Sequence, residues 1–186
     1  MTSSSDRIFD DLLARRCQRG DAQAWRTLVE RYEMRLLYFV RRLVDDERDA
    51  WDVLQQTWMS ALKSIGRLDE PRALRTWLYR IARNEAINHL RRNGRRMETS
   101  DSEAVENVVD DSADDEIGSA ETAEQVHAAL SRLSLRHREV LTLHFLEDAS
   151  LEEIAEILEV PAGTVKSRLF YARAALREQL EQREVR

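Results

Sequence analysis

The chain has 186 residues, enough for one large domain or two small ones. Only 5 glycines and 2 prolines occur, and 34% of the residues are charged. This composition is typical of a protein built of helices that each have a solvent-exposed face. No apolar run reaches the roughly 18 to 20 residues of a membrane span, and no basic segment followed by an apolar stretch opens the chain. These features predict a cytoplasmic protein. The single Cys17 excludes an internal disulfide and a cysteine-based metal cluster.

The net charge of −6 is distributed unevenly along the chain. Residues 1–97 carry 20 basic and 14 acidic side chains, and residues 125–186 carry 9 and 10. Residues 98–124 carry 11 acidic side chains and no basic one. Because that acidic segment has little apolar surface to bury, we expect a flexible linker between two small helical domains, residues 1–97 and 125–186.

Two helices are predicted at the start of the chain, over residues 8–19 and 22–44. Gly20 is placed to end the first, and Asp21 to cap the second. The second helix has a continuous apolar stripe that we expect to be buried. It consists of Trp25, Leu28, Val29, Tyr32, Leu36, Phe39, Val40 and Leu43.

A third helix is predicted over residues 47–65, where apolar residues keep the i, i+3, i+4, i+7 spacing for four turns. Its opposite face presents an unusual mixture of side chains: Trp51, Asp52, Gln55, Gln56 and Met59. Aromatic residues and methionine among uncharged amides are typical of protein-binding surfaces. An equally supported alternative is that Trp51 folds down against the preceding helix.

The fourth predicted helix covers residues 73–91 and carries a basic stripe. Arg80, Arg83, Asn84, Ile87 and Arg91 share one arc of the helical wheel, with Asn88 beside it, and Arg92, Arg95 and Arg96 extend it. Such a stripe indicates nucleic-acid binding. Trp77 and Tyr79 are candidates for stacking on unpaired bases. The alternative is that Trp77 belongs to the core and the arginines only keep the surface soluble.

The C-terminal part begins with two predicted helices, over residues 124–132 and 135–145. A helix-turn-helix pattern follows, with helices over residues 151–158 and from 164 onward. In the break between them, Pro161 is suited to opening a helix and Gly163 to a tight chain reversal. The inward positions of the second helix are Val165, Leu169, Ala172 and Leu176.

The outward face of this last helix predicts DNA binding. Ser167, Phe170, Tyr171 and Ala174 face away from the apolar side. Cations flank them, namely Lys166, Arg168, Arg173 and Arg177. Cations with exposed aromatic rings suit the phosphates and thymine methyl groups of a major groove. The alternative is an ordinary helical hairpin in which Phe170 packs on a neighbouring helix.

Nothing in the sequence indicates catalysis or a cofactor. His137 and His144 are two helical turns apart, but a metal site would need a third ligand beside them. No nucleophile–base pairing, glycine-rich phosphate loop or paired-carboxylate arrangement stands out.

Taken together, these blocks resemble a bacterial sigma factor of the sigma-70 class, extracytoplasmic-function (ECF) subfamily. The segments GDAQAWRTLVERY and RDAWDVLQQTWMSAL look like the family's polymerase-binding segment. ALRTWLYRIARNEAINHLRR looks like its minus-10 segment, and the stretch from LSLRHREV to FYARAAL like its minus-35 domain. The order of the blocks, with an acidic linker between them, is the specific part of the resemblance.

The resemblance implies roles for particular residues. The third helix would dock on the β′ clamp coiled coil of core RNA polymerase through its exposed face, with the β flap as a second contact. Residues 67–75 would capture a flipped base, and Asn84 and Asn88 match family positions at the melted strand. The predicted minus-10 set is Trp77, Tyr79, Arg80, Arg83, Asn84, Asn88, Arg91 and Arg92. The predicted minus-35 set is Thr164, Lys166, Ser167, Arg168, Phe170, Tyr171, Arg173 and Arg177, the last two on phosphates.

The chain departs from the family pattern at Trp51 and Gln56, where acids are common, and at Tyr171, where a cation is common. The resemblance also implies an anti-sigma partner. We further expect the acidic linker to fold over the basic faces when polymerase is absent. The alternative functions are a stand-alone helix-turn-helix regulator, which would not need the Trp51 face or the basic stripe, and a purely structural helical adaptor.

Overall fold

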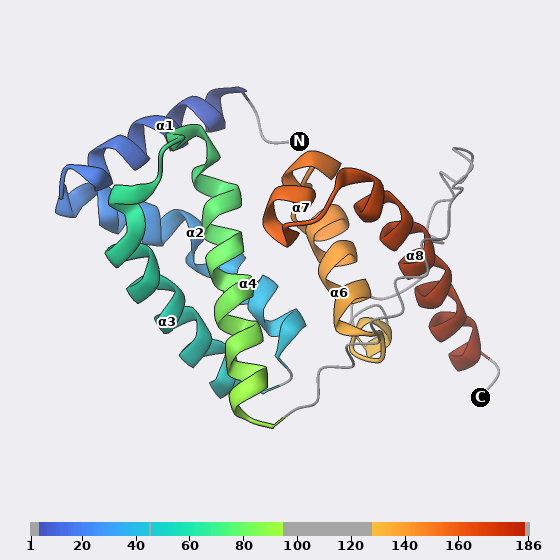
Figure 1. Cartoon of the computed structure of the whole chain (residues 1–186). Coiled ribbons are helices and arrows are strands. Elements are labelled where there is room, and N and C mark those ends of the chain that lie inside the picture. Colours follow the sequence, from blue (N-terminus) through green and yellow to red (C-terminus); the bar gives the residue numbers. More distant parts are fainter. Residues whose placement is uncertain (1–3, 45, 95–127, 185–186) are drawn as a thin grey trace.

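A computed structural model describes residues 4–44, 46–94 and 128–184, and every regular element within them is helical. The predicted linker, residues 98–124, lies outside the described residues, and so does the expectation that it covers the basic faces. The described chain forms an N-terminal unit of four helices and a C-terminal unit that contains the helix-turn-helix (Figure 1). The predicted all-helical fold is confirmed.

The N-terminal unit is a bundle whose helices pack on one another in chain order. Its helices are α1 (Ser4–Gln18), α2 (Ala22–Leu43), α3 (Glu47–Ser64) and α4 (Leu74–Arg92). Two short 3₁₀ turns, η1 (Ile65–Arg67) and η2 (Pro71–Ala73), connect α3 to α4. Pro71 therefore opens a 3₁₀ turn, and the side chain of Glu70 caps that turn.

The helix boundaries follow the predicted capping residues. Gly20 has a φ of 78°, and the Asp21 carboxylate accepts hydrogen bonds from the backbone N–H groups of Gln23 and Ala24 at the start of α2. α1 begins earlier than predicted, at Ser4. Its first two turns are held by tertiary contacts, since Arg31 on α2 donates to Asp6 at 2.6 Å and to Asp10 at 2.9 Å.

Cys17 lies in the core of the N-terminal unit. Its side chain is 2% exposed, and burial raises the pKa of its thiol to about 11. A thiol with that pKa stays protonated at neutral pH, so Cys17 acts as a small apolar residue.

The C-terminal unit comprises α6 (Leu135–Leu141), the π-helical turn η3 (Thr142–Leu146), α7 (Leu151–Leu158) and α8 (Ala162–Glu184). Residues 128–130 are also helical. Both α6 and α7 pack along α8. The helix predicted over residues 135–145 is thus present, with its last turn widened to a π turn.

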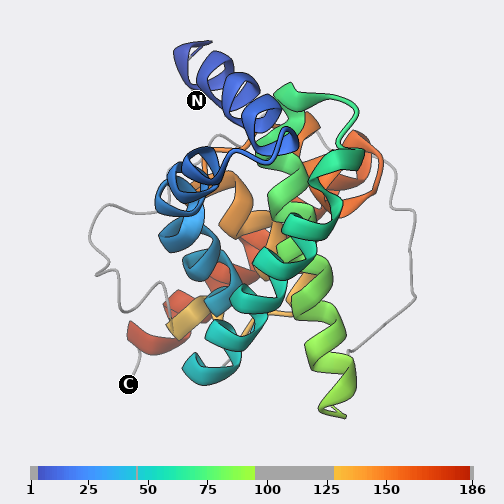
Figure 2. The same cartoon turned by 90° about the vertical axis from the view of Figure 1, so that its left-hand side faces the viewer.

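The two units pack against each other. α4 contacts α7, and α2 contacts α6, so α2 and α4 together form the side of the N-terminal bundle that packs against the C-terminal unit (Figures 1 and 2). The buried apolar side chains of both units belong to one continuous cluster. No helix of the described residues is long and apolar enough to cross a membrane.

Candidate functional site

The first helix of the helix-turn-helix, α7, is capped at both ends. At the start of α7, Ser150 Oγ accepts from the Glu153 N–H at 3.2 Å, and Glu153 Oε2 accepts from the Ser150 N–H at 2.9 Å. This capping box satisfies donors that a helix N-terminus leaves open. α7 ends at Glu159, which has a left-handed backbone with φ 56°. The prediction that Gly163 makes the chain reversal was wrong: Gly163 lies in the first turn of α8, and Glu159 takes the left-handed conformation.

α8 turns its apolar side inward as predicted. Val165, Leu169, Ala172 and Leu176 are all less than 5% exposed. On the opposite side Phe170 is 43% exposed and Tyr171 37%, and their rings meet edge to face at 5.3 Å. The alternative in which Phe170 packs on a neighbouring helix therefore does not hold in this structure.

The predicted minus-35 residues divide into two groups by exposure. Lys166, Phe170, Tyr171 and Arg177 are exposed, and Thr164, Ser167, Arg168 and Arg173 are half-buried. The Arg173 guanidinium lies 5.1 Å from the centre of the Phe145 ring and 3.4 Å from His144 Nε2. Burial, with the charge of Arg168, lowers the pKa of His137. α8 thus presents an aromatic pair bordered by cations, two of which rest against its own unit.

On α4, half of the predicted minus-10 residues are open to solvent: Asn84, Asn88, Arg91 and Arg92 are exposed. Arg80 is half-buried. Trp77 is 8% exposed, which agrees with the alternative that it belongs to the core. Ile87, placed on the same arc by its spacing, is also 8% exposed.

Tyr79 and Arg83 are covered by the C-terminal unit. Tyr79 is 1% exposed, its ring packs edge to face on Phe39 at 5.3 Å, and its hydroxyl donates to the Glu147 carboxylate. Arg83 Nε donates to Glu139 Oε1 at 2.8 Å. In this arrangement neither side chain can reach a base. The predicted basic stripe along α4 is therefore interrupted at these two residues. The physical reason is a tertiary contact that the helical wheel does not contain.

The predicted base-capturing loop, residues 67–75, is fastened to α1. Gln18 Nε2 donates to the carbonyl oxygens of Leu68 at 2.8 Å and Ile65 at 3.2 Å. Leu68 and Pro71 are buried, while Asp69, Glu70 and Arg72 remain exposed. Arg75, at the end of the loop, is only 6% exposed because it points between the two units.

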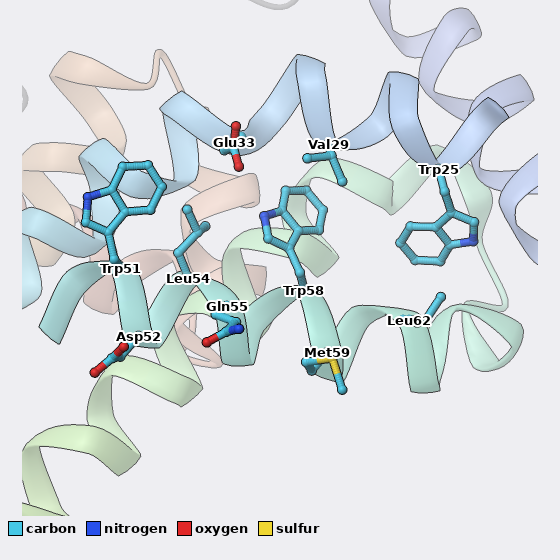
Figure 3. Close-up of a pocket in the computed structure, with 10 residues that line it drawn as sticks. All are labelled: Trp25, Val29, Glu33, Trp51, Asp52, Leu54, Gln55, Trp58, Met59 and Leu62. Atoms are coloured by element: carbon cyan, nitrogen blue, oxygen red, sulfur yellow. The ribbon is translucent and has the colours of Figure 1, made fainter. Parts of the chain in front are cut away.

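The predicted protein-binding face on α3 is fully open. Trp51, Asp52, Gln55, Gln56 and Met59 are all exposed, Trp51 to 45% and Met59 to 46%. Trp51 and Trp58 rise from α3 toward α2, where Val29 and Glu33 face them across a groove of about 580 Å³ (Figure 3). Trp51 thus borders the groove between α2 and α3, with its ring directed toward α2 and partly exposed.

Three residues of the contact between the units were missed by the sequence reasoning, namely Arg35, Glu139 and Glu147, and Arg75 was predicted only as the end of the base-capturing loop. Arg35 on α2 donates to Glu147 Oε2 from Nη2 at 3.0 Å and from Nε at 3.2 Å, and Arg75 Nη2 donates to the Glu147 carbonyl oxygen. Burial raises the pKa of Glu139, although Arg83 acts in the opposite direction. No local motif marks these residues, since Arg35 and Glu147 are 112 positions apart.

Among the described residues, no three His, Cys, Asp or Glu side chains lie close enough to hold a metal ion. The geometry instead consists of three surfaces for macromolecules: the aromatic and basic face of α8, the partly covered face of α4, and the tryptophan groove between α2 and α3.

Comparison with known proteins matches two segments of the chain to family regions. Residues 28–96 match Sigma-70 region 2, and residues 129–178 match Sigma-70 region 4. The RNA polymerase sigma-H factor of Pseudomonas aeruginosa is 39% identical over 181 residues, which cover 92% of this chain and 94% of that protein. The ECF RNA polymerase sigma-E factor of Escherichia coli K12 is 37% identical over the same shares of both chains.

Solved structures resemble the whole described arrangement. CnrH, in complex with the cytosolic domain of CnrY, gives a TM-score of 0.70 at 25% identity, covering 93% of this chain and 97% of that chain. The sigma factor RpoE of Bartonella quintana, in complex with the anti-sigma factor NepR, gives 0.67 at 29% identity, covering 86% and 98%. The chain belongs to the sigma-70 family of RNA polymerase sigma factors, in its ECF subfamily.

Proposed function

We propose that this sigma factor, without catalysis of its own, binds core RNA polymerase and reads a promoter with two surfaces. α8 would enter the major groove at the minus-35 element, and α4 would hold the melted strand of the minus-10 element. The observation that carries the proposal is the outward pair Phe170 and Tyr171, bordered by Lys166 and Arg177, on the second helix of a capped helix-turn-helix. A helix of this kind reads base edges from the major groove.

The exposed side chains of α4 support its role at the minus-10 element. Asn84 and Asn88 lie one turn apart on the open part of the helix, followed by Arg91 and Arg92. Amide groups can hydrogen-bond to the edges of unpaired bases, and arginines neutralise the adjacent phosphates. The roles of Tyr79 and Arg83 in this element require that the C-terminal unit first move away.

The tryptophan groove supports docking on polymerase. Trp51 and Met59 supply exposed apolar area, while Asp52 and Gln55 supply polar contacts at its edge. Interface cores favour aromatic residues and methionine over charged ones. The β′ clamp coiled coil, implied by the family resemblance, is the proposed occupant, and the β flap would contact the C-terminal unit.

An inhibitory partner is the remaining part of the proposal. Two solved sigma factors that resemble this chain over most of its length are complexes, one with the anti-sigma factor NepR and one with a domain of CnrY. We propose that a partner of the anti-sigma type also binds this chain.

Transcription reconstituted from core polymerase and the purified chain tests the proposal. Promoters selected by the reconstituted holoenzyme should support transcripts that core polymerase alone does not make. Phe170→Ala should weaken promoter binding by about tenfold, because one groove contact is worth about 1–3 kcal/mol. Asn84→Ala with Asn88→Ala should leave closed-complex binding intact and reduce permanganate reactivity of the melted strand.

Met34→Ala serves as the matched control, since Met34 is 65% exposed and does not line the tryptophan groove. This variant should transcribe like the wild type. If the reconstituted holoenzyme made no promoter-dependent transcript, the proposal would be contradicted. Tight duplex binding at physiological salt without polymerase would instead support a stand-alone regulator.

A further inference from the structure

The tryptophan groove between α2 and α3 is built by two facing rows of side chains. Trp25, Val29 and Glu33 follow one another at one-turn intervals along α2, and Trp51 and Trp58 lie two turns apart along α3. The two helices pack on each other, so the rows face across a groove of about 580 Å³ (Figure 3). Small-molecule sites have volumes of about 300–1,000 Å³, so the groove is large enough for one such molecule.

Both charged residues that line this groove are acidic. Glu33 is half-buried on α2 and Asp52 is exposed on α3, whereas the remaining lining residues are neutral. No ion pair of the described chain involves either carboxylate. The groove therefore has an uncompensated negative charge and favours a cationic occupant.

The tryptophan rings supply a second element of recognition. Trp51 and Trp58 rise from α3, and Glu33 lies on α2 opposite the gap between their rings (Figure 3). Leu54, which lies between them on α3 and is 2% exposed, gives the gap an apolar floor. Seven residues of helix span about 10 Å, which leaves room for one flat group that needs about 7–8 Å to contact a ring on each side. The negative face of an indole ring also attracts a cation.

We infer that the tryptophan groove is a binding site for a small, flat organic cation of the aryl amidinium or aryl guanidinium class. The aromatic body of this ligand lies between Trp51 and Trp58 above Leu54, and its cationic head donates to the Glu33 carboxylate, with Asp52 at the rim. A planar amidinium suits a carboxylate, because two parallel N–H···O bonds can join the two groups.

Charge distinguishes this ligand from other occupants of the groove. A neutral apolar molecule would take water away from Glu33 without supplying an opposite charge, which opposes binding. An anionic molecule would be repelled by Glu33 and Asp52. A bound cation would also cover the face proposed for polymerase docking. That consequence, unlike the site itself, rests on the proposed function.

Titration of the full chain with benzamidine, an aryl amidinium, tests the site against the neutral isostere benzamide. Both ligands are added to about 10 mM at constant ionic strength, and ¹H–¹⁵N NMR spectra follow the indole N–H signals of the four tryptophans. The signals of Trp51 and Trp58 should shift saturably with benzamidine, whereas that of Trp77, 8% exposed in the core, should stay in place. Benzamide should bind at least about tenfold more weakly, because it lacks the charge that pairs with Glu33.

Glu33→Gln should abolish the preference for benzamidine over benzamide, since it removes the charge and keeps the shape of the side chain. Glu30→Gln is the matched control: it removes the same charge from an exposed position of α2 that does not line the groove, and it should keep the preference. The cation site would be overturned by the absence of a saturable shift, by equal affinities of the wild type for the two ligands, or by equal loss of the preference in both variants.

A competition measurement separates this site from the proposed function. With benzamidine at about ten times its dissociation constant, the apparent affinity of the chain for core polymerase should fall about tenfold if both occupy the groove. Saturable, Glu33-dependent binding of benzamidine without such competition would support the cation site and count against the groove as the docking surface. Failure of the benzamidine titration would count against the cation site alone.

Discussion

Tyr79 shows how one residue links the two units. Its ring packs on Phe39 of α2, and its hydroxyl reaches Glu147 of the C-terminal unit, with Arg35 and Arg75 alongside. Burial, followed by the Glu147 charge, raises the pKa of Tyr79 well above its ordinary value of 10.0. The folded protein therefore keeps this hydroxyl protonated at a pH where an unfolded chain has lost the proton.

This difference predicts a specific loss of stability in alkali. The contribution of Tyr79 is fully present below pH 10.0 and is lost as the pH rises toward the higher folded-state pKa, by about 1.4 kcal/mol per pH unit. Tyr79→Phe should remove this share of the slope of unfolding free energy against pH, measured by urea unfolding between about pH 9 and 11.5.

Tyr32→Phe is the companion variant, because burial also raises the pKa of Tyr32, and Asp10 accepts from its hydroxyl at 2.5 Å. Tyr32→Phe should also make the unfolding free energy fall less steeply as the pH rises, by the contribution of Tyr32. If the unfolding free energy of Tyr79→Phe fell with pH as steeply as that of the wild type, titration of Tyr79 would not contribute to the loss of stability in alkali.

At the scale of single elements, α7 shows how local signals and local strain coexist. The spacing of Ile154 and Leu158 and the end of α7 at Leu158 were predicted from the sequence. The left-handed backbone of Glu159, φ 56° and ψ 44°, was not, because side-chain-bearing residues rarely take this conformation.

Glu159→Gly should therefore stabilise the protein, by about 0.5–1 kcal/mol, since glycine adopts this conformation without steric cost. Glu156→Gly is the control: it makes the same substitution inside α7, where glycine costs about 1 kcal/mol. Urea unfolding at neutral pH measures both. Destabilisation by both variants to the same degree would contradict the assignment of strain to position 159.

In the whole molecule, the α8 face, the α4 face and the tryptophan groove differ in how accessible they are to a macromolecular partner. The tryptophan groove between α2 and α3 faces away from the contact between the units and is open, whereas part of α4 is covered. Under the proposed function, the chain can thus meet polymerase through the tryptophan groove while part of α4 is still covered. This order places polymerase docking ahead of promoter melting.

Trp51→Ala should test the docking surface. A central aromatic anchor in an interface contributes about 2 kcal/mol or more, so core-polymerase affinity should fall about 30-fold, measured by competition for a labelled holoenzyme. The melting temperature should change little, because Trp51 is 45% exposed. Met34→Ala, an exposed change outside the groove, should leave the affinity unaltered. If Trp51→Ala and Met34→Ala bound core polymerase with equal affinity, the Trp51 face would not be the docking surface.

Local sequence patterns were enough to predict most helix positions and which face of each helix is buried. Local spacing placed Val165 and Leu169 inward and Trp51 outward, and Asp21 marked the start of a helix. These properties depend on residues within about one or two helical turns, where periodicity and capping act. The family resemblance, carried by blocks of such residues, was likewise contained in the sequence.

Which part of the α4 face is open depends on the packing of the two units and could not be predicted from the sequence. Glu139 lies 56 positions from Arg83, and Glu147 lies 68 positions from Tyr79. A helical wheel shows that a stripe is basic, but the partner that covers it depends on how the two units pack. Burial and charge pairing are properties of that packing, and no periodicity within either helix encodes them.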